Sequence, residues 1–295
     1  MTGAERGFLL LTSHLGNPGR KVLTTAQLRA LAARMQSAEK PEQDRELTEK
    51  DLLVLGCDRE MARRIVGLLA EEDVLDHYLS RAARMDCYPI TRANGAYPVL
   101  LRQRLGLDSP GCLWAKGNPE ILRTPAVALV GSRDLLEENR AFAEAVGHHA
   151  AGQGLTLVSG NARGADRAAQ KACLEAGGRV ISIVADELSK QPLKRNVLYL
   201  SEEDFDEPFS AQRALRRNRC IHALGQMVFV AQCDLGKGGT WDGTAKNLRF
   251  GWSPVACFRD GSEASRELEQ MGAYLVTEED LSDLGSLAEG GQLTF

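Results

Sequence analysis

Two kinds of hydrophobic spacing divide the chain near residue 85. Before that point, apolar residues recur three and four positions apart, as at Met61, Ile65 and Leu68, which is the spacing of one buried face of an α-helix. Thr48 stands three residues before Asp51, a capping box with Asp in place of Glu. We therefore predict a bundle of short helices over residues 1–85, with an exposed loop over the polar residues 37–46.

After residue 126, short apolar runs alternate with helical patterns. The runs are continuous rather than alternating, as in strands that are buried on both faces of a parallel sheet. The predicted strands are Val127–Val130, Leu155–Val158, Val180–Val184, Met227–Val230, Val255–Phe258 and Tyr274–Val276. The predicted helices are Leu136–Ala151, Ala165–Ala176, Ala211–Ala223, Thr244–Phe250 and Ser262–Met271.

This alternation predicts an α/β fold with a doubly wound, mainly parallel sheet and helices on both faces. Two further strand-like runs, Cys87–Ile90 and Cys112–Lys116, are separated by turn signals such as Asn94-Gly95. We expect a helical domain over residues 1–85, an α/β domain over residues 86–285 and a flexible, glycine-rich tail over residues 286–295.

Two glycine-containing turns follow predicted strands. Gly131-Ser132-Arg133 ends the first strand, and Ser159-Gly160 followed by Arg163-Gly164 ends the second. Ligands of such sheets bind beyond the carboxyl ends of the strands, where helix N-termini attract anions. We expect the two turns to converge on one phosphate-bearing ligand.

The turns do not spell the fingerprints of common nucleotide cofactors. They lack both GxxxxGK[ST] and GxGxxG, which disfavours a Walker-type ATPase and a standard NAD enzyme. Asp166 falls in the first turn of the following helix, and we interpret it as a carboxylate that interacts with the helix dipole rather than as a catalytic group.

Two later segments add positive charge. One contains Arg216, Arg217, Asn218 and Arg219, and the other is a glycine-rich loop with Lys237 and Gly238. Both could grip phosphates. The alternative for the arginine run is a solvated helix face that balances the acidic residues between 202 and 207.

Composition narrows the possible functions. The formal net charge is -4, so any nucleic-acid site must be a local basic patch. The seven cysteines include no CxxC pair, which favours buried thiols in a reducing cytoplasm. No apolar stretch approaches the ~20 residues of a membrane helix, so we expect a cytoplasmic protein without membrane contact. The histidines form no metal set, and we predict neither a metal nor a cofactor nor a catalytic residue.

The segments VALVGSR, LVSGNARGADRAAQKACLEAGG and RRNRCIHAL, in this order and spacing, resemble the DNA-processing protein A (DprA, or Smf) family over about residues 50–260. The resemblance implies an extended Rossmann fold after a SAM-like helical domain. It also implies single-stranded DNA binding, a homodimer and transfer of the DNA to the RecA recombinase in natural transformation. By match to the motifs, the DNA-binding residues would be Gly131, Ser132, Arg133, Ser159, Gly160, Arg163, Gly164, Arg216, Arg217, Asn218, Arg219, Lys237 and Gly238.

The chain departs from the family pattern in several places. Ala165 stands where the family has Ile, the glycine loop reads GKGGTWDGTAKNL, and we expect no C-terminal winged helix. These differences favour a divergent member. The alternative is a nucleotide sensor or a LOG-like phosphoribohydrolase, because GGTWDGT resembles the PGGxGTxxE loop of that group. The proline is missing there, and Asp242 does not match the position of the glutamate.

Overall fold

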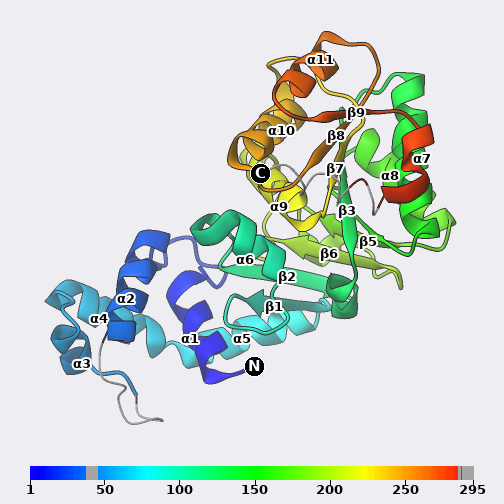
Figure 1. Ribbon diagram of the computed structural model, residues 1–295. Coiled ribbons are helices and arrows are strands. Elements are labelled where there is room, and N and C mark those ends of the chain that lie inside the picture. Colours follow the sequence, from blue (N-terminus) through cyan, green and yellow to red (C-terminus); the bar gives the residue numbers. More distant parts are fainter. Residues whose placement is uncertain (38–45, 285–286, 288–295) are drawn as a thin grey trace. The chain divides into compact units, whose positions relative to one another are not determined.

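The computed structural model describes residues 1–37, 46–284 and 287, and the chain packs as two compact units, Met1–Tyr97 and Pro98–Phe295 (Figure 1). We call them the helical unit and the sheet unit. The predicted loop over 37–46 and the predicted tail over 286–295 lie outside the described residues, apart from Ser37, Glu46 and Leu287.

The helical unit buries one apolar face of each of several short helices. Its core includes Leu31, Leu52 and Ile65. The predicted capping box is present, because the Thr48 hydroxyl accepts from the Asp51 N–H and the Asp51 carboxylate accepts from the Thr48 N–H. The elements are α1 (Gly3–Thr12), α2 (Thr25–Ser37), α3 (Glu49–Val54), α4 (Arg59–Leu69), α5 (Glu72–Ala83) and β1 (Cys87–Thr91). A bundle of short helices therefore precedes the sheet, as the spacing predicts, and its SAM-like character stays a prediction.

In the sheet unit, strands and helices alternate along the chain. The strands are β2 (Cys112–Gly117), β3 (Ala126–Val130), β4 (Thr156–Ser159), β5 (Arg179–Ile183), β6 (Val197–Ser201), β7 (Val228–Val230), β8 (Val255–Phe258) and β9 (Tyr274–Val276). The helices are α6 (Val99–Leu105), α7 (Glu137–Gly152), α8 (Ala165–Glu175), α9 (Ala211–Leu224), α10 (Gly238–Phe250) and α11 (Glu263–Gln270). Short 3₁₀ turns occupy Gly106–Asp108, Pro119–Arg123, Leu188–Lys190 and Glu279–Asp283.

The strand order confirms the doubly wound prediction. In this unit the order is β2-β6-β5-β4-β3-β7-β8-β9, and every pair is parallel except β2 with β6. From β3 the chain winds outward through β4, β5 and β6, and it then returns to β7 on the other side of β3. Helices α7 and α8 cover one face of the sheet, and α9 and α10 cover the other (Figure 1). The reversal between β3 and β7 is the switch point at which such sheets bind ligands.

Three features of this unit were not predicted from the sequence, and the first of them is helix α6, Val99–Leu105. Strand β6 is fully buried, but its five residues follow the polar segment 192–196 and form too short a run to stand out. Helix α10 begins at Gly238, not at Thr244. Glycine has low helix propensity, but the Asn218 side chain donates to the Gly239 carbonyl and holds the first turn in place.

Candidate nucleic-acid interface

A cavity of about 380 Å³ lies at the switch point of the sheet. Its walls come from the turn after β3, from the segment that joins β4 to α8, from the side of α9 and from the loop between β7 and α10. Four chain segments therefore meet at the cavity, next to the point where the carboxyl ends of β3 and β7 lie side by side.

The two glycine turns lie directly against each other, and their convergence on one ligand stays a prediction. The Ala165 N–H donates to the Ser132 carbonyl at 3.1 Å, which joins the start of α8 to the turn after β3. Gly164 has a φ of 83°, and a Cβ there would overlap the carbonyl oxygens of Ser132 and Arg133. Only glycine therefore allows the second turn to lie directly on the first.

A buried ion pair forms one wall of the cavity. Arg217 of α9 and Asp166 of α8 are both buried, with Nη2 and Oδ2 4.0 Å apart, and the Ala162 N–H donates to Asp166 at 3.2 Å. Gly160 makes this packing possible, because a Cβ there would overlap both the Arg217 guanidinium and the Asp166 carboxylate. Gly160 and Ser159 thus support the wall rather than line the cavity.

Burial shifts the ionisation of both partners. It raises the pKa of the Asp166 carboxyl, while the Arg217 charge and the Ala162 N–H oppose the rise. It lowers the pKa of Arg217, and Asp166 opposes that change. Arg217 keeps its charge because the usual pKa of a guanidinium lies so high. Its Nε and Nη1 are buried without a hydrogen-bond partner among the described residues.

The other arginines of α9 point elsewhere. Arg213 pairs with Glu207, Arg216 lies 3.3 Å from Glu203, and Arg219 lies 2.6 Å from Glu202. For these three arginines, the alternative interpretation holds: they form a helix face whose charge balances acidic residues between 202 and 207. Arg216 and Arg219 are not brought to the cavity, whereas Arg217 and Asn218 line it.

The glycine-rich loop closes the far side of the cavity. Lys237 is exposed and caps α10, so the first N–H groups of this helix face the same space. The Thr240 hydroxyl donates to the Gly131 carbonyl at 3.0 Å, and the Asn218 side chain donates to the Gly239 carbonyl at 3.1 Å. These bonds join the loop to β3 and to α9.

A second cavity of about 380 Å³ continues the first. The two share Arg133 and Arg217, so we describe them together as the groove. Arg163, Arg167 and Phe209 line the second cavity, and Phe209 is 58% exposed. Arg167 was not predicted as a site residue, although it lies four residues after Arg163. Phe209 was not predicted either, because no motif marks it.

The charge of the groove is mixed. Arg163 pairs with Asp134 at 3.0 Å, and Arg217 faces Asp166. Arg133, Arg167 and Lys237 are exposed and form no ion pair among the residues that the structure describes. Three uncompensated cations thus remain along the groove.

The predicted site residues fall into three groups. The first cavity is lined by Gly131, Ser132, Arg133, Asp166, Arg217, Asn218, Lys237 and Gly238, and the second adds Arg163. Ser159, Gly160 and Gly164 support the walls, and Arg216 and Arg219 lie outside. Their role in binding stays a prediction.

Other kinds of site find little support in the described part of the chain. No group of three His, Cys, Asp or Glu side chains there could hold a metal ion, and all seven cysteines are free thiols. Over the same residues, no helix is both long and apolar enough to span a membrane.

The fold and the groove define a Rossmann-like protein with a cleft at its switch point that is lined in part by arginine and lysine side chains. A family model described as DNA recombination-mediator protein A matches residues 89–284, and the chain belongs to this family.

Individual relatives agree with this assignment. The chain is similar to DNA processing protein DprA of Streptococcus pneumoniae, with 32% identity over 183 residues, which cover 58% of this chain and 64% of that protein. It is 30% identical to protein Smf of Escherichia coli over 186 residues, 58% of this chain and 50% of that one. The chain thus spans between half and two thirds of the length of these curated relatives.

Solved structures show the same fold. The structure of S. pneumoniae DprA superposes with a TM-score of 0.70 and 25% identity, covering 90% of this chain and 94% of that one. DNA processing protein A of Helicobacter pylori, solved to describe its single-stranded DNA binding mode, gives a TM-score of 0.54 at 23% identity, covering 69% of this chain and 94% of that one.

Proposed function

We propose that this chain binds single-stranded DNA in the groove. The observation that carries the proposal is the buried Arg217, whose Nε and Nη1 have no partner among the described residues and which lines both cavities. Buried guanidinium donors are normally satisfied, and a phosphate oxygen would satisfy these. Arg133, Arg167 and Lys237 would hold further phosphates.

The extent of the groove favours a strand over a mononucleotide. Two cavities in continuation offer room for more than one nucleotide, and the uncompensated cations are spread over both. Exposed Phe209 stands beside the arginines, where it would stack on a base. The single-stranded DNA binding of the H. pylori relative supports this choice.

The central experiment measures binding of a fluorescent oligothymidine to the full chain over a range of salt concentrations. We expect Arg133→Ala to weaken binding to all sequences alike and to reduce the salt slope by about 0.7, the value for one phosphate contact on a single strand. Arg123→Ala removes an exposed arginine that lies outside the groove and serves as the control. Equal salt slopes for the two variants would refute the groove.

The base contact is tested separately. Phe209→Ala should lower the affinity by about 1–3 kcal/mol, the usual size of one base–aromatic stack. Phe250→Ala is the matched control, because Phe250 is 59% exposed and lines neither cavity. Equal affinities of the two variants would remove Phe209 from the binding site.

We propose that binding involves no chemical step. Asp242, the acidic residue in the loop that resembles the phosphoribohydrolases, pairs with Lys246 at 2.8 Å and is not part of the lining of the groove. Incubation of the protein with nucleoside monophosphates and chromatography of the products tests this. Release of free base would favour the hydrolase instead.

We also propose that the chain acts as a homodimer that protects single-stranded DNA and loads the RecA recombinase on it. Membership of the recombination-mediator family supports this role. Light scattering gives the oligomeric state, and nuclease digestion of the oligonucleotide tests protection. Formation of RecA filaments on the DNA, with and without this protein, tests loading.

A further inference from the structure

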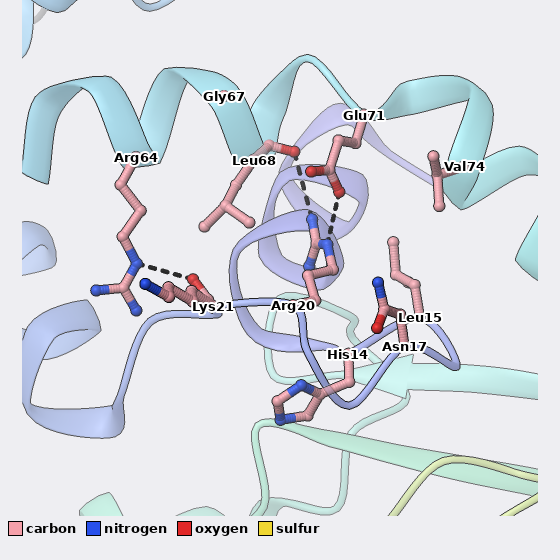
Figure 2. A pocket seen from close by; sticks show the side chains of 10 residues that line it. All are labelled: His14, Leu15, Asn17, Arg20, Lys21, Arg64, Gly67, Leu68, Glu71 and Val74. Atoms are coloured by element: carbon pink, nitrogen blue, oxygen red, sulfur yellow. Dashed lines mark hydrogen bonds and ion pairs between the residues drawn. The ribbon is translucent and has the colours of Figure 1, made fainter.

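The helical unit contains a cavity of its own, of about 420 Å³ (Figure 2). The loop between α1 and α2, the second half of α4 and the start of α5 line it. Three basic side chains, His14, Lys21 and Arg64, take part in the lining together with the pair of Arg20 and Glu71.

Arg20 and Glu71 neutralise each other. The Arg20 Nε donates to Glu71 Oε2 at 2.6 Å, and its Nη2 donates to the Leu68 carbonyl (Figure 2). Its remaining bonds are to the carbonyls of Ser13 and Leu10. Leu68 belongs to the last turn of α4, so Arg20 also covers the negative end of that helix. This pair therefore leaves little net charge for a ligand.

Arg64 is held differently. Its Nε donates to the Lys21 carbonyl at 2.8 Å, and its Nη2 donates to the Val22 carbonyl. Both acceptors are neutral, so the guanidinium is fixed in place while its charge stays uncompensated. Lys21 belongs to the backbone segment to which Arg64 is hydrogen-bonded. Among the described residues, neither side chain has a carboxylate within 4.0 Å.

Two positive charges, the fixed Arg64 guanidinium and the exposed Lys21 ammonium, thus border one open cavity, and the described residues supply no carboxylate partner to either. Gly67 adds open space, because a Cβ there would meet no atom within 4 Å. A phosphate would supply the missing negative charge. Arg64 Nε and Nη2 already donate to carbonyls, so its Nη1 would donate to the phosphate oxygens.

We propose that this cavity binds a phosphate group, with Lys21 and Arg64 as its cationic ligands and His14 as a further donor. The phosphate could belong to a nucleic-acid backbone or to a free nucleotide, and the chemistry of recognition is the same. The proposal does not depend on the groove of the sheet unit.

The test observes His14 directly in the full chain, labelled with ¹³C in the histidine rings, and His14→Gln assigns the signal. Sodium phosphate, thymidine monophosphate and an oligothymidine are titrated separately, each against sodium chloride at the same ionic strength. We expect a saturable shift of the His14 signal with at least one of the three. Lys21→Glu should weaken that response by roughly tenfold or more, because it replaces an attractive charge by a repulsive one.

Arg63→Ala is the matched control. Arg63 precedes Arg64 in α4, its side chain is 72% exposed, and it does not line the cavity. A response to the oligothymidine alone identifies a nucleic-acid backbone as the ligand, and a response to phosphate or the nucleotide identifies a free phosphate.

Absence of a saturable shift with all three probes overturns the proposal, as does an unchanged response in Lys21→Glu. If Lys21→Glu fails to fold, Lys21→Gln takes its place with the same expected direction. Whichever probe shifts the His14 signal should also shift it in Arg133→Ala, so failure of this proposal can be distinguished from failure of the groove.

Discussion

Among the residues that the structure describes, each unit buries one arginine, and the two are held in different ways. Arg20 of the helical unit is 8% exposed and donates to one carboxylate and three carbonyls. Arg217 of the sheet unit is 6% exposed and faces one carboxylate at 4.0 Å, with Nε and Nη1 unpartnered among the described residues. The same side chain, equally buried, is satisfied in one place and not in the other.

The difference separates two uses of a buried charge. Removing a guanidinium from water costs several kcal/mol, and its partners in the folded chain offset that cost for Arg20. They offset it only in part for Arg217, so a local cost in stability remains there until a ligand supplies acceptors. Deviations of this kind concentrate at functional sites.

The largest expected effect concerns the satisfied arginine. Arg20→Ala should lower the free energy of unfolding of the helical unit by about 4 kcal/mol, because Glu71 loses its partner and three carbonyls lose a donor. Urea denaturation of the full chain measures this, with Arg63→Ala as the control. A loss as small as that of the control would mean that Arg20 is not structural.

The second effect concerns the unsatisfied arginine. Arg217→Met should weaken oligothymidine binding roughly 100-fold, about 3 kcal/mol, because the buried phosphate ligand is lost. The double variant Arg217→Met/Asp166→Leu replaces the ion pair by apolar side chains. It should regain the stability that Arg217→Met loses, while its affinity for the oligothymidine stays as low as that of Arg217→Met. Recovery of binding in the double variant would show that Arg217 serves only the fold.

His222 allows a test of whether a missing hydrogen-bond partner is enough to mark a functional residue. Its ring nitrogens are buried without a partner among the described residues, yet it lines neither cavity of the groove. Burial lowers the pKa of His222 to about 3. The unfolded chain binds a proton near pH 6.5 and the folded chain does not, so stability falls as the pH drops below about 6.5.

Because of this histidine, we expect the free energy of unfolding to fall by about 2 kcal/mol between pH 7 and pH 5. In His222→Leu that part of the acid sensitivity should disappear, while the affinity for oligothymidine at pH 7 stays within about twofold of the original. Denaturation curves at the two pH values measure the first effect. A large loss of DNA affinity would show that the missing partner matters more than the cavity.

The smallest effect belongs to the outer face of α9. Arg216 is exposed and pairs with Glu203, so Arg216→Ala should change affinity and stability by less than about 0.5 kcal/mol. Anisotropy titration beside Arg133→Ala makes the comparison. A tenfold loss of affinity would mean that DNA also contacts this face.

The sequence predicts the positions of the glycine turns well, because continuous apolar runs fix where β3 and β4 end. It does not show which arginine of α9 enters the groove. That depends on which side of α9 faces the groove. It also depends on Glu202 and Glu203, which follow the unpredicted strand β6 and form ion pairs with Arg219 and Arg216. Phe209 reaches the groove through tertiary packing alone, so no local pattern could have identified it.

The bonds from Thr240 to Gly131 and from Asn218 to Gly239 have a kinetic consequence. They hold three segments in place around the first cavity in the absence of DNA. Binding of a DNA strand therefore does not have to wait for a loop to become ordered. Association should then proceed at a rate set by diffusion and charge, and substitutions in the groove should change chiefly how long a bound strand stays.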